Sequence, residues 1–168
     1  MKRLRRGAVL ALCLGIVITL AVRSVATAQA DNLIVPGERV GPIRLGMYRE
    51  DVLKAFGQPS KTHTGQPSFW DTYERRKHHW LDIWYGETGD TPYRVVSIDV
   101  HNLDEYGTGN GVRTGSSVQD VLREYGSADT QDCTGSHYCM LRYKGIIFVY
   151  DPQDNGIYKI EVFRQPEK

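Results

Sequence analysis

The sequence predicts an α+β fold of two tandem repeats, each a helix followed by an antiparallel meander, with the helices packed on one face of the sheet. The segment 46–57 returns 69 residues later as 115–126, and both glycines and the Asp-Val-Leu core are identical in the two copies. Three strand-like segments follow each copy, and no helical segment separates them, so parallel crossovers are excluded. The expected division is repeat 1 at 31–101, a linker at 102–110 and repeat 2 at 111–168.

The two copies of the repeated segment are expected to be short helices that end at glycine. In the second copy Ser117 can cap the helix and Asp120 completes an acidic variant of the capping box, whereas Tyr48 is a poor cap in the first copy. Gly57 and Gly126 stand where a left-handed C-terminal cap is wanted. Each helix is expected to bury one stripe on the sheet, namely Val52, Leu53 and Phe56, and Val121, Leu122 and Tyr125.

The strand-like segments alternate apolar and polar residues, as half-buried strands do. They cover 69–73, 80–86 and 93–101 in repeat 1, and 138–143, 146–151 and 157–164 in repeat 2. The alternation predicts a helix-facing core of Leu81, Ile83, Tyr85, Val96, Ile98 and Val100, with Ile146, Phe148, Tyr150, Tyr158, Ile160 and Val162 as counterparts. Turn-forming residues separate the strands, for example at Asn155-Gly156.

The first thirty residues have the organisation of a secretory signal peptide. Four basic residues precede an apolar run over 7–22, and small residues lead to a predicted cleavage after Ala30. A retained membrane anchor is the alternative, but sixteen residues reach only about 24 Å as a helix. Cys13 follows Leu12 and does not resemble a lipid-attachment site. The mature protein is therefore expected to be secreted or periplasmic and not embedded in a membrane.

The charge balance changes when this segment is removed. It holds five of the 21 basic residues and none of the 20 acidic ones, so the mature chain has 21 − 5 = 16 basic against 20 acidic groups, a net charge of −4. A mildly acidic chain without a basic block gives no electrostatic basis for binding nucleic acid. Nucleic-acid partners are therefore not expected.

Cys133 and Cys139 are the cysteines that remain in the predicted mature chain. In an oxidising compartment a pair this close is typical of a local disulfide, and Gly135 and Ser136 supply the turn that the closure needs. A redox or metal role would require CxxC spacing or further ligands. The sequence therefore predicts a structural disulfide.

Neither a metal site, a cofactor nor a catalytic centre is expected. The five histidines are not spaced as pairs on one helix face, and Asp151, Asp154 and Asn155 lack the rest of a calcium loop. The glycine-rich segment 107–111 lacks the Gly-Lys-Ser/Thr ending of a phosphate-binding loop. No nucleophile with a neighbouring base is evident, so the chain is expected not to be an enzyme.

One strand presents an unusual set of side chains to the face opposite the helices. If Leu81, Ile83 and Tyr85 point to the core, then Trp80, Asp82 and Trp84 point away from it. Val95, Ser97 and Asp99, with Val149, Lys159, Glu161 and Phe163, are expected to share that face, and Trp70 joins them if its strand keeps the matching register. Aromatic residues interleaved with charges are typical of protein-recognition surfaces. The alternative is that the loop 62–68 covers these tryptophans.

The repeated motif resembles the repeat unit of the β-lactamase-inhibitory-protein-like fold and of small outer-membrane assembly lipoproteins of the SmpA/OmlA type. The residues that carry the resemblance are Gly46, Asp51, Val52, Leu53, Gly57 and Pro59, and again Gly115, Asp120, Val121, Leu122 and Gly126. The resemblance implies two units whose sheets join into a saddle-shaped surface that binds protein. The missing lipid-attachment cysteine argues against the lipoprotein role, and no inhibitor contact residue maps onto this sequence.

Together these observations predict an exported, non-catalytic binding module that contacts a protein partner through a sheet face, with Trp80 and Trp84 as anchors. One alternative is a protein inhibitor of a secreted or periplasmic hydrolase, acting through the same face or the loop around Cys133. A second alternative is a structural or assembly protein of the cell envelope. A motif of this kind specifies a fold and leaves the function open.

Overall fold

The computed structural model describes residues 32–65, 68–88, 91–134 and 138–165. The predicted signal peptide and its cleavage after Ala30 lie outside these residues. Strands account for 54% of the described structure and helices for 13%, so the fold is mostly β. Among the described residues, no helix combines the length and the hydropathy that crossing a membrane requires.

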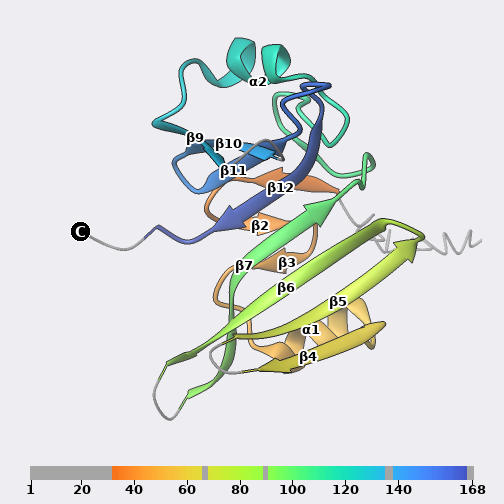
Figure 1. Cartoon of the computed structure of the whole chain (residues 1–168). Coiled ribbons are helices and arrows are strands. Elements are labelled where there is room, and N and C mark those ends of the chain that lie inside the picture. The colour runs from red at the N-terminus through yellow and green to blue at the C-terminus, as the bar shows by residue number, and fades with distance from the viewer. Residues whose placement is uncertain (1–31, 66–67, 89–90, 135–137, 166–168) are drawn as a thin grey trace, which may run out of the picture.

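Eight antiparallel strands form one large sheet with the order β4-β5-β6-β7-β12-β11-β10-β9 (Figure 1). The pairing of β7 with β12 joins the first four strands in the chain to the last four. The strands are β4 (Lys61–Gly65), β5 (Ser68–Arg76), β6 (His79–Thr88), β7 (Thr91–His101), β9 (Thr130–Thr134), β10 (Tyr138–Tyr143), β11 (Ile146–Tyr150) and β12 (Ile157–Phe163).

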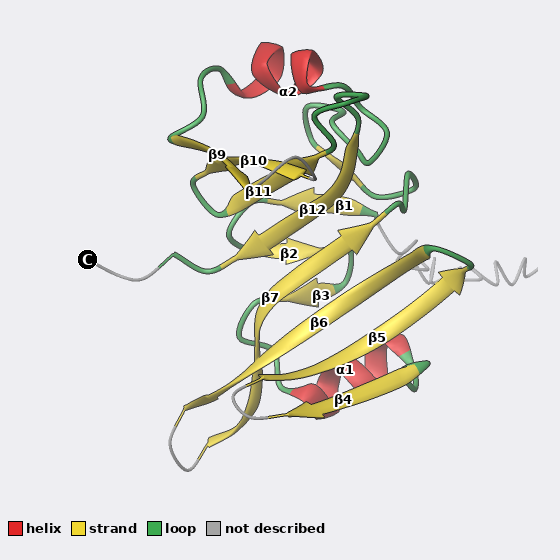
Figure 2. Ribbon diagram, in the orientation of Figure 1, coloured by secondary structure: helices red, strands yellow, loops and turns green. Residues whose placement is uncertain are grey.

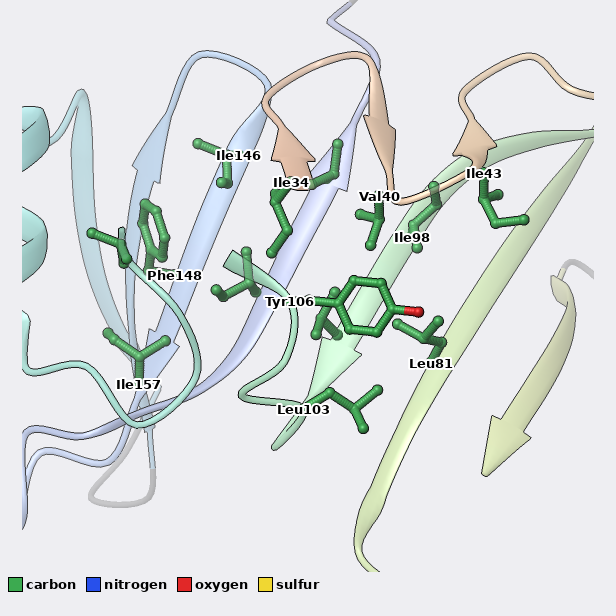
Figure 3. Packing of buried hydrophobic residues seen from close by; sticks show 14 of the residues in the cluster. Ile34, Val40, Ile43, Leu81, Ile98, Leu103, Tyr106, Ile146, Phe148 and Ile157 are labelled. Atoms are coloured by element: carbon green, nitrogen blue, oxygen red, sulfur yellow. The ribbon is translucent and has the colours of Figure 1, made fainter. Parts of the chain in front are cut away.

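A second, four-stranded sheet is built mainly from the segment before the first helix. Its order is β3 (Ile43–Arg44), β2 (Arg39–Val40), β1 (Leu33–Val35) and β8 (Gly107–Thr108), and only the β1–β8 pair is parallel. Ile34, Val40 and Ile43 of this small sheet point toward Leu81 and Ile98 of the large sheet (Figure 3). The small sheet therefore covers the middle of one face of the large sheet, here called the inner face.

The predicted α+β fold, with helices packed on one face of the sheet, is wrong. Helices α1 (Arg49–Phe56) and α2 (Val118–Tyr125) have eight residues each and lie near opposite ends of the large sheet (Figure 2). Each is only about 12 Å long, whereas eight strands span about 34 Å, so two such helices cannot cover the face. Helix α1 buries Val52, and α2 buries Val118 and Val121. The division into repeats and linker stays a prediction.

The capping signals of both helices are confirmed, but one residue of each predicted stripe, Leu53 in α1 and Leu122 in α2, is not buried. Ser117 and Asp120 form the capping box of α2, and Tyr48 precedes α1 without a side-chain cap. Gly126 adopts a φ of 75° at the end of α2, a value that favours glycine. Leu122, however, was expected in the buried stripe and is 41% exposed. Its place one residue after Val121 turns it out of the narrow contact that an eight-residue helix makes.

Two β-bulges change the predicted core. The register shifts between Trp84 and Tyr85, so Val95 is 2% exposed and Val96, predicted to be in the core, is 42% exposed. A bulge inserts an extra residue and reverses the alternation beyond it. A second register shift lies in the pairing of β11 with β12, between Val149 and Tyr150. It buries Ile157, whereas Tyr158, which was predicted to be in the core, is only half-buried.

A buried ion pair fixes α1 to the end of the large sheet. Asp71 of β5 has no exposed surface, and Arg49 at the start of α1 donates to both of its carboxylate oxygens, at 2.8 and 3.1 Å. The hydroxyl of Thr62 in β4 donates to Asp71 at 2.6 Å. One carboxylate therefore connects the helix, the edge strand and the neighbouring strand.

The predicted linker, 102–110, adds residues to the core between the two sheets and a strand to the small sheet. Leu103 and Tyr106 are buried in the core. Gly107–Thr108 forms β8 and pairs with β1 of the small sheet. The segment is thus held between the two halves of the large sheet by apolar contacts and backbone hydrogen bonds.

Candidate functional site

The candidate site is the face of the large sheet opposite the small sheet, here called the outer face. Because Leu81, Ile83 and Tyr85 lie in the core, the alternation of β6 turns its other side chains to this face. The central residues of the outer face come from four neighbouring strands: Trp70 and Thr72 of β5, Trp80, Asp82 and Trp84 of β6, Ser97, Asp99 and His101 of β7, and Lys159, Glu161 and Phe163 of β12.

Stacked rings form one row across this face. His63, Trp70 and Trp84 lie opposite one another on β4, β5 and β6. The rings of His63 and Trp70 stack with centroids 4.3 Å apart, and those of Trp70 and Trp84 with centroids 4.5 Å apart. All three side chains are half-buried. The row therefore presents partly exposed rings whose orientation is fixed by their neighbours.

The predicted alternative was that the loop 62–68 covers the tryptophans; residues 66 and 67 lie outside the described residues, and residues 62–65 do not form a loop. These last residues belong to β4, which pairs with β5 at the edge of the sheet. His63 contacts Trp70 from the neighbouring strand in the same sheet. Trp70, Trp80 and Trp84 all keep some exposed surface.

A second row brings three carboxylates together. Asp82, Asp99 and Glu161 lie opposite one another on β6, β7 and β12. Lys159 contacts two of them, with its Nζ 3.2 Å from Asp99 and 3.4 Å from Glu161. Like charges directly opposite one another destabilise a sheet unless they are compensated. Lys159 supplies that compensation on one side of the row.

Asp82 is compensated by hydrogen bonds. Its carboxylate accepts from the Thr72 hydroxyl at 2.6 Å and from the Trp80 indole at 2.9 Å. Burial alone would raise the pKa of Asp82, but hydrogen bonding to His101, Thr72 and Trp80 outweighs it and lowers the pKa. Because its indole N–H is held by Asp82, Trp80 is fixed in place.

His101 completes the centre of the outer face. Its ring stacks on Trp80 with centroids 4.5 Å apart. Its Nε2 lies 3.4 Å from Asp82 and 3.9 Å from Asp99, within ion-pair range. The same nitrogen is buried and has no well-aligned hydrogen bond. His101 therefore stands between two carboxylates, with one buried ring nitrogen facing both.

The two charged residues of β12 on this face, Lys159 and Glu161, both have raised pKa values. Burial lowers the pKa of Lys159, but Asp99 and Glu161 outweigh that effect and raise it, so the ammonium group is strongly held. Burial and the negative charge of Asp99 together raise the pKa of Glu161, although Lys159 and Arg142 act in the opposite direction. The three carboxylates of this row thus have two cationic side chains beside them, Lys159 and Arg142.

The structure brings the predicted site residues together. Trp70, Trp80, Asp82 and Trp84 share one face on two adjacent strands. His101 was missed, although it continues the Ser97, Asp99 alternation by one further step. His63 was missed because β4 was not predicted, and its polar sequence gives no strand signal.

The predicted disulfide is confirmed. Cys133 of β9 and Cys139 of β10 lie opposite one another and are bonded. The bond lies at the edge of the large sheet, far in strand order from the tryptophans. It attaches the outermost strand to its neighbour.

Metal ligation is not evident in the part of the chain that the structure describes, where no group of three or more His, Cys, Asp or Glu side chains could hold an ion. The predictions that the protein uses neither a cofactor nor a catalytic centre stay predictions.

No protein-family model matches the sequence, and no curated protein matches it. Solved structures do resemble it. A DUF4309 family protein (YjgB) from Bacillus subtilis subsp. subtilis str. 168 has a TM-score of 0.55 at 15% identity, covering 77% of this chain and 88% of that one. An extracellular protein containing a SCP domain, from Bacillus anthracis str. Ames, has a TM-score of 0.54 at 12% identity, covering 72% of this chain and 44% of that one.

A third neighbour is a cysteine-rich secretory protein (SAV1118) from Staphylococcus aureus subsp. aureus Mu50, with a TM-score of 0.53 at 14% identity. That match covers 81% of this chain and 49% of the other, so the chain spans less than half the length of two of these three neighbours. At such identities the likeness shows a shared fold alone. The resemblance to the β-lactamase-inhibitory-protein-like family is not tested by these neighbours and stays a prediction.

Proposed function

We propose that the protein is exported and acts as a non-catalytic binding module whose outer face contacts a protein partner. One observation carries the proposal: three half-exposed tryptophans, Trp70, Trp80 and Trp84, surround a cluster of charged side chains on a single sheet face. Tryptophan is enriched among the residues that dominate the affinity of protein interfaces. The expectation that the protein is not an enzyme is part of this proposal.

The rigidity of these side chains favours binding. Trp84 stacks on Trp70, and Trp80 is held by both Asp82 and His101. A surface whose rings are already ordered loses little side-chain entropy when a partner binds. Preorganised aromatic side chains are therefore suited to the centre of an interface.

The patch formed by the tryptophans and the charged side chains has the size of the centre of an interface and not of a whole one. From β5 to β12 the patch crosses three strand spacings, about 14 Å, and from Trp80 to Trp84 it follows the strand for about 13 Å. A stable interface buries about 800 Å² on each partner, several times this area. The partner is therefore expected to extend beyond the tryptophans over the rest of the sheet.

Export is supported by three features. The N-terminal thirty residues have the organisation of a signal peptide. The Cys133–Cys139 disulfide is of the kind that persists in oxidising compartments. Two neighbours of the same fold are described as extracellular or secretory proteins.

Affinity capture from the exported fraction of the source cells tests the proposal. The wild-type protein is expected to retain a protein that Trp84→Ala retains about 30-fold more weakly, the loss typical of a dominant interface residue. The matched control is Tyr93→Ala, which removes an exposed aromatic ring that lies beside α1. If both variants bind the same proteins as tightly as the wild type, the outer face is not the binding surface.

A fluorescence measurement gives an independent test. Half-exposed tryptophans should emit at wavelengths intermediate between those of buried and free indole, and acrylamide should quench them. Adding the captured partner should shift the emission to shorter wavelength and protect it from acrylamide. Unchanged quenching in the complex would contradict contact through these rings.

A further inference from the structure

Ser97 interrupts a row of rings on the outer face. In the described strands from β4 to β12 the row runs His63, Trp70, Trp84, Ser97, Phe163, and each residue lies opposite the next. Ser97 is the only short side chain in this row. It is only half-buried, so Trp84 and Phe163, which also keep some exposed surface, do not close over it.

The spacing of the strands suits a flat group at this position. Neighbouring strands lie about 4.8 Å apart, which places the side chains of Trp84 and Phe163 about 10 Å apart across Ser97. A planar group above Ser97 would lie about 5 Å from each ring, within the usual range for stacked rings and for cation–π contacts. The observed stacking of His63 on Trp70 and of Trp70 on Trp84, at 4.3 and 4.5 Å, has a similar spacing.

The charges beside this position favour a cation. Asp99 follows Ser97 by two residues on β7, Glu161 precedes Phe163 by two on β12, and the two acids lie opposite one another. With Asp82 they make three carboxylates in register, near the ammonium group of Lys159, the guanidinium of Arg142 and the imidazole of His101. Burial and the charge of Asp99 raise the pKa of Glu161, although Lys159 and Arg142 act in the opposite direction.

We propose that the position above Ser97 receives an arginine side chain of the protein partner, stacked between Trp84 and Phe163 and paired with Glu161. The proposal rests on the proposed function, because it names the side chain that the outer face would receive. Arginine fits better than lysine, since its planar guanidinium both stacks on rings and pairs with a carboxylate through two hydrogen bonds.

The protein already contains one contact of this kind. The Arg142 guanidinium lies over the Phe163 ring, with Cζ 5.6 Å from the centroid. Arg142 belongs to β10, on the side of β12 away from β7. The partner's arginine would therefore approach Phe163 from the opposite side, where Ser97 leaves room.

A titration of the purified protein with three short peptides tests the inference. Acetyl-Gly-Arg-Gly-amide is compared with its citrulline analogue, which has nearly the same shape without the charge, and with its lysine analogue. The NMR signal of the Trp84 indole N–H, assigned by its loss in Trp84→Phe, reports binding. The arginine peptide should shift this signal saturably, with about tenfold weaker binding for citrulline and an intermediate affinity for lysine.

Two variants locate the peptide. Ser97→Leu fills the position above the strand and should abolish the shift, and Glu161→Gln should weaken binding about tenfold while keeping the shape of the side chain. Thr130→Leu is the matched control, a similar enlargement of an exposed strand residue on β9, four strands from β7. Thermal unfolding of each variant shows whether it is folded. If Ser97→Leu does not fold, the affinity of Glu161→Gln for the arginine peptide decides whether the inference holds.

The outcomes separate this inference from the proposed function. If no peptide shifts the Trp84 signal, if arginine and citrulline bind alike, or if Glu161→Gln binds like the wild type, the arginine inference is overturned. If Trp84→Ala loses the captured partner while Ser97→Leu and Glu161→Gln keep it, the binding module stands and the arginine inference falls. If Trp84→Ala also keeps the partner, the proposed function falls.

Discussion

Replacing Arg49 with methionine should destabilise the protein more than replacing Asp71 with asparagine, although both changes break the same ion pair. Asp71 has no exposed surface, whereas the Arg49 side chain is 28% exposed. Without Arg49 the carboxylate stays buried, beside the hydroxyls of Thr62 and Tyr85 and without a cationic partner. Without the charge of Asp71, the guanidinium can turn toward water.

The magnitudes follow from that asymmetry. Leaving a buried charge without its partner costs about 3–5 kcal/mol, which is the loss expected for Arg49→Met. Losing charge-assisted hydrogen bonds while the remaining group is solvated costs about 1–2 kcal/mol, the loss expected for Asp71→Asn. The double variant should be more stable than Arg49→Met alone, because no unpaired charge stays buried.

Urea unfolding followed by circular dichroism measures these differences. With a slope of about 2 kcal/mol per molar urea, a difference of about 2 kcal/mol separates the two midpoints by about 1 M. Arg75→Met is the control, since Arg75 is an exposed arginine that contacts a ring without a buried carboxylate beneath it. If Asp71→Asn destabilises the protein as much as Arg49→Met, burial of the carboxylate does not explain the role of this pair.

Three further predictions concern stability. The Cys133–Cys139 disulfide closes a short loop, so its reduction should lower the free energy of unfolding by about 2 kcal/mol. The shift of the urea midpoint on adding reductant measures this loss. Val121→Ala should cost about 1–2 kcal/mol and Leu122→Ala less than about 0.5 kcal/mol, because only the first is buried; equal midpoints for the two variants would contradict the burial of α2. Hydrogen bonds from Ser117 lower the pKa of Asp120 to about 2, below its ordinary value, so this stabilisation is present above pH 4 and disappears as the pH falls toward 2; Asp120→Asn should remove that part of an acid titration followed by circular dichroism.

The sequence allowed the longer elements to be predicted because their patterns are local. Tyr138–Tyr143 was predicted with the observed bounds, and the capping box of α2 is visible in the sequence. The small sheet could not be predicted, since strands such as Arg39–Val40 and Ile43–Arg44 are too short to show alternation. Without it, the helices were the only evident cover for the inner face, and the fold class was wrong.

The sequence predicted that Ser97, Asp99, Lys159, Glu161 and Phe163 share the outer face with the tryptophans, but not which of them lie opposite one another. The alternation of β6 places Trp80, Asp82 and Trp84 on one face, as expected. The carboxylate row depends on the pairing of Asp99 with Glu161, residues that are far apart in the sequence. No local pattern specifies which strands become neighbours, so the three carboxylates and the interruption at Ser97 became visible only in the structure.

The position of β12 has a consequence for how the chain reaches its final form. This strand follows β7 by more than fifty residues in the sequence, yet it lies between β7 and β11 in the middle of the large sheet. Until it is in place, β7 presents an unpaired backbone edge, of the kind that recruits other chains. Because contacts across such a sequence separation form slowly, a chain emerging N-terminus first must keep that edge from aggregating until β12 has been synthesised. Deleting β12 would therefore divide the sheet into two halves, each with an exposed and unpaired strand edge, rather than merely shorten it.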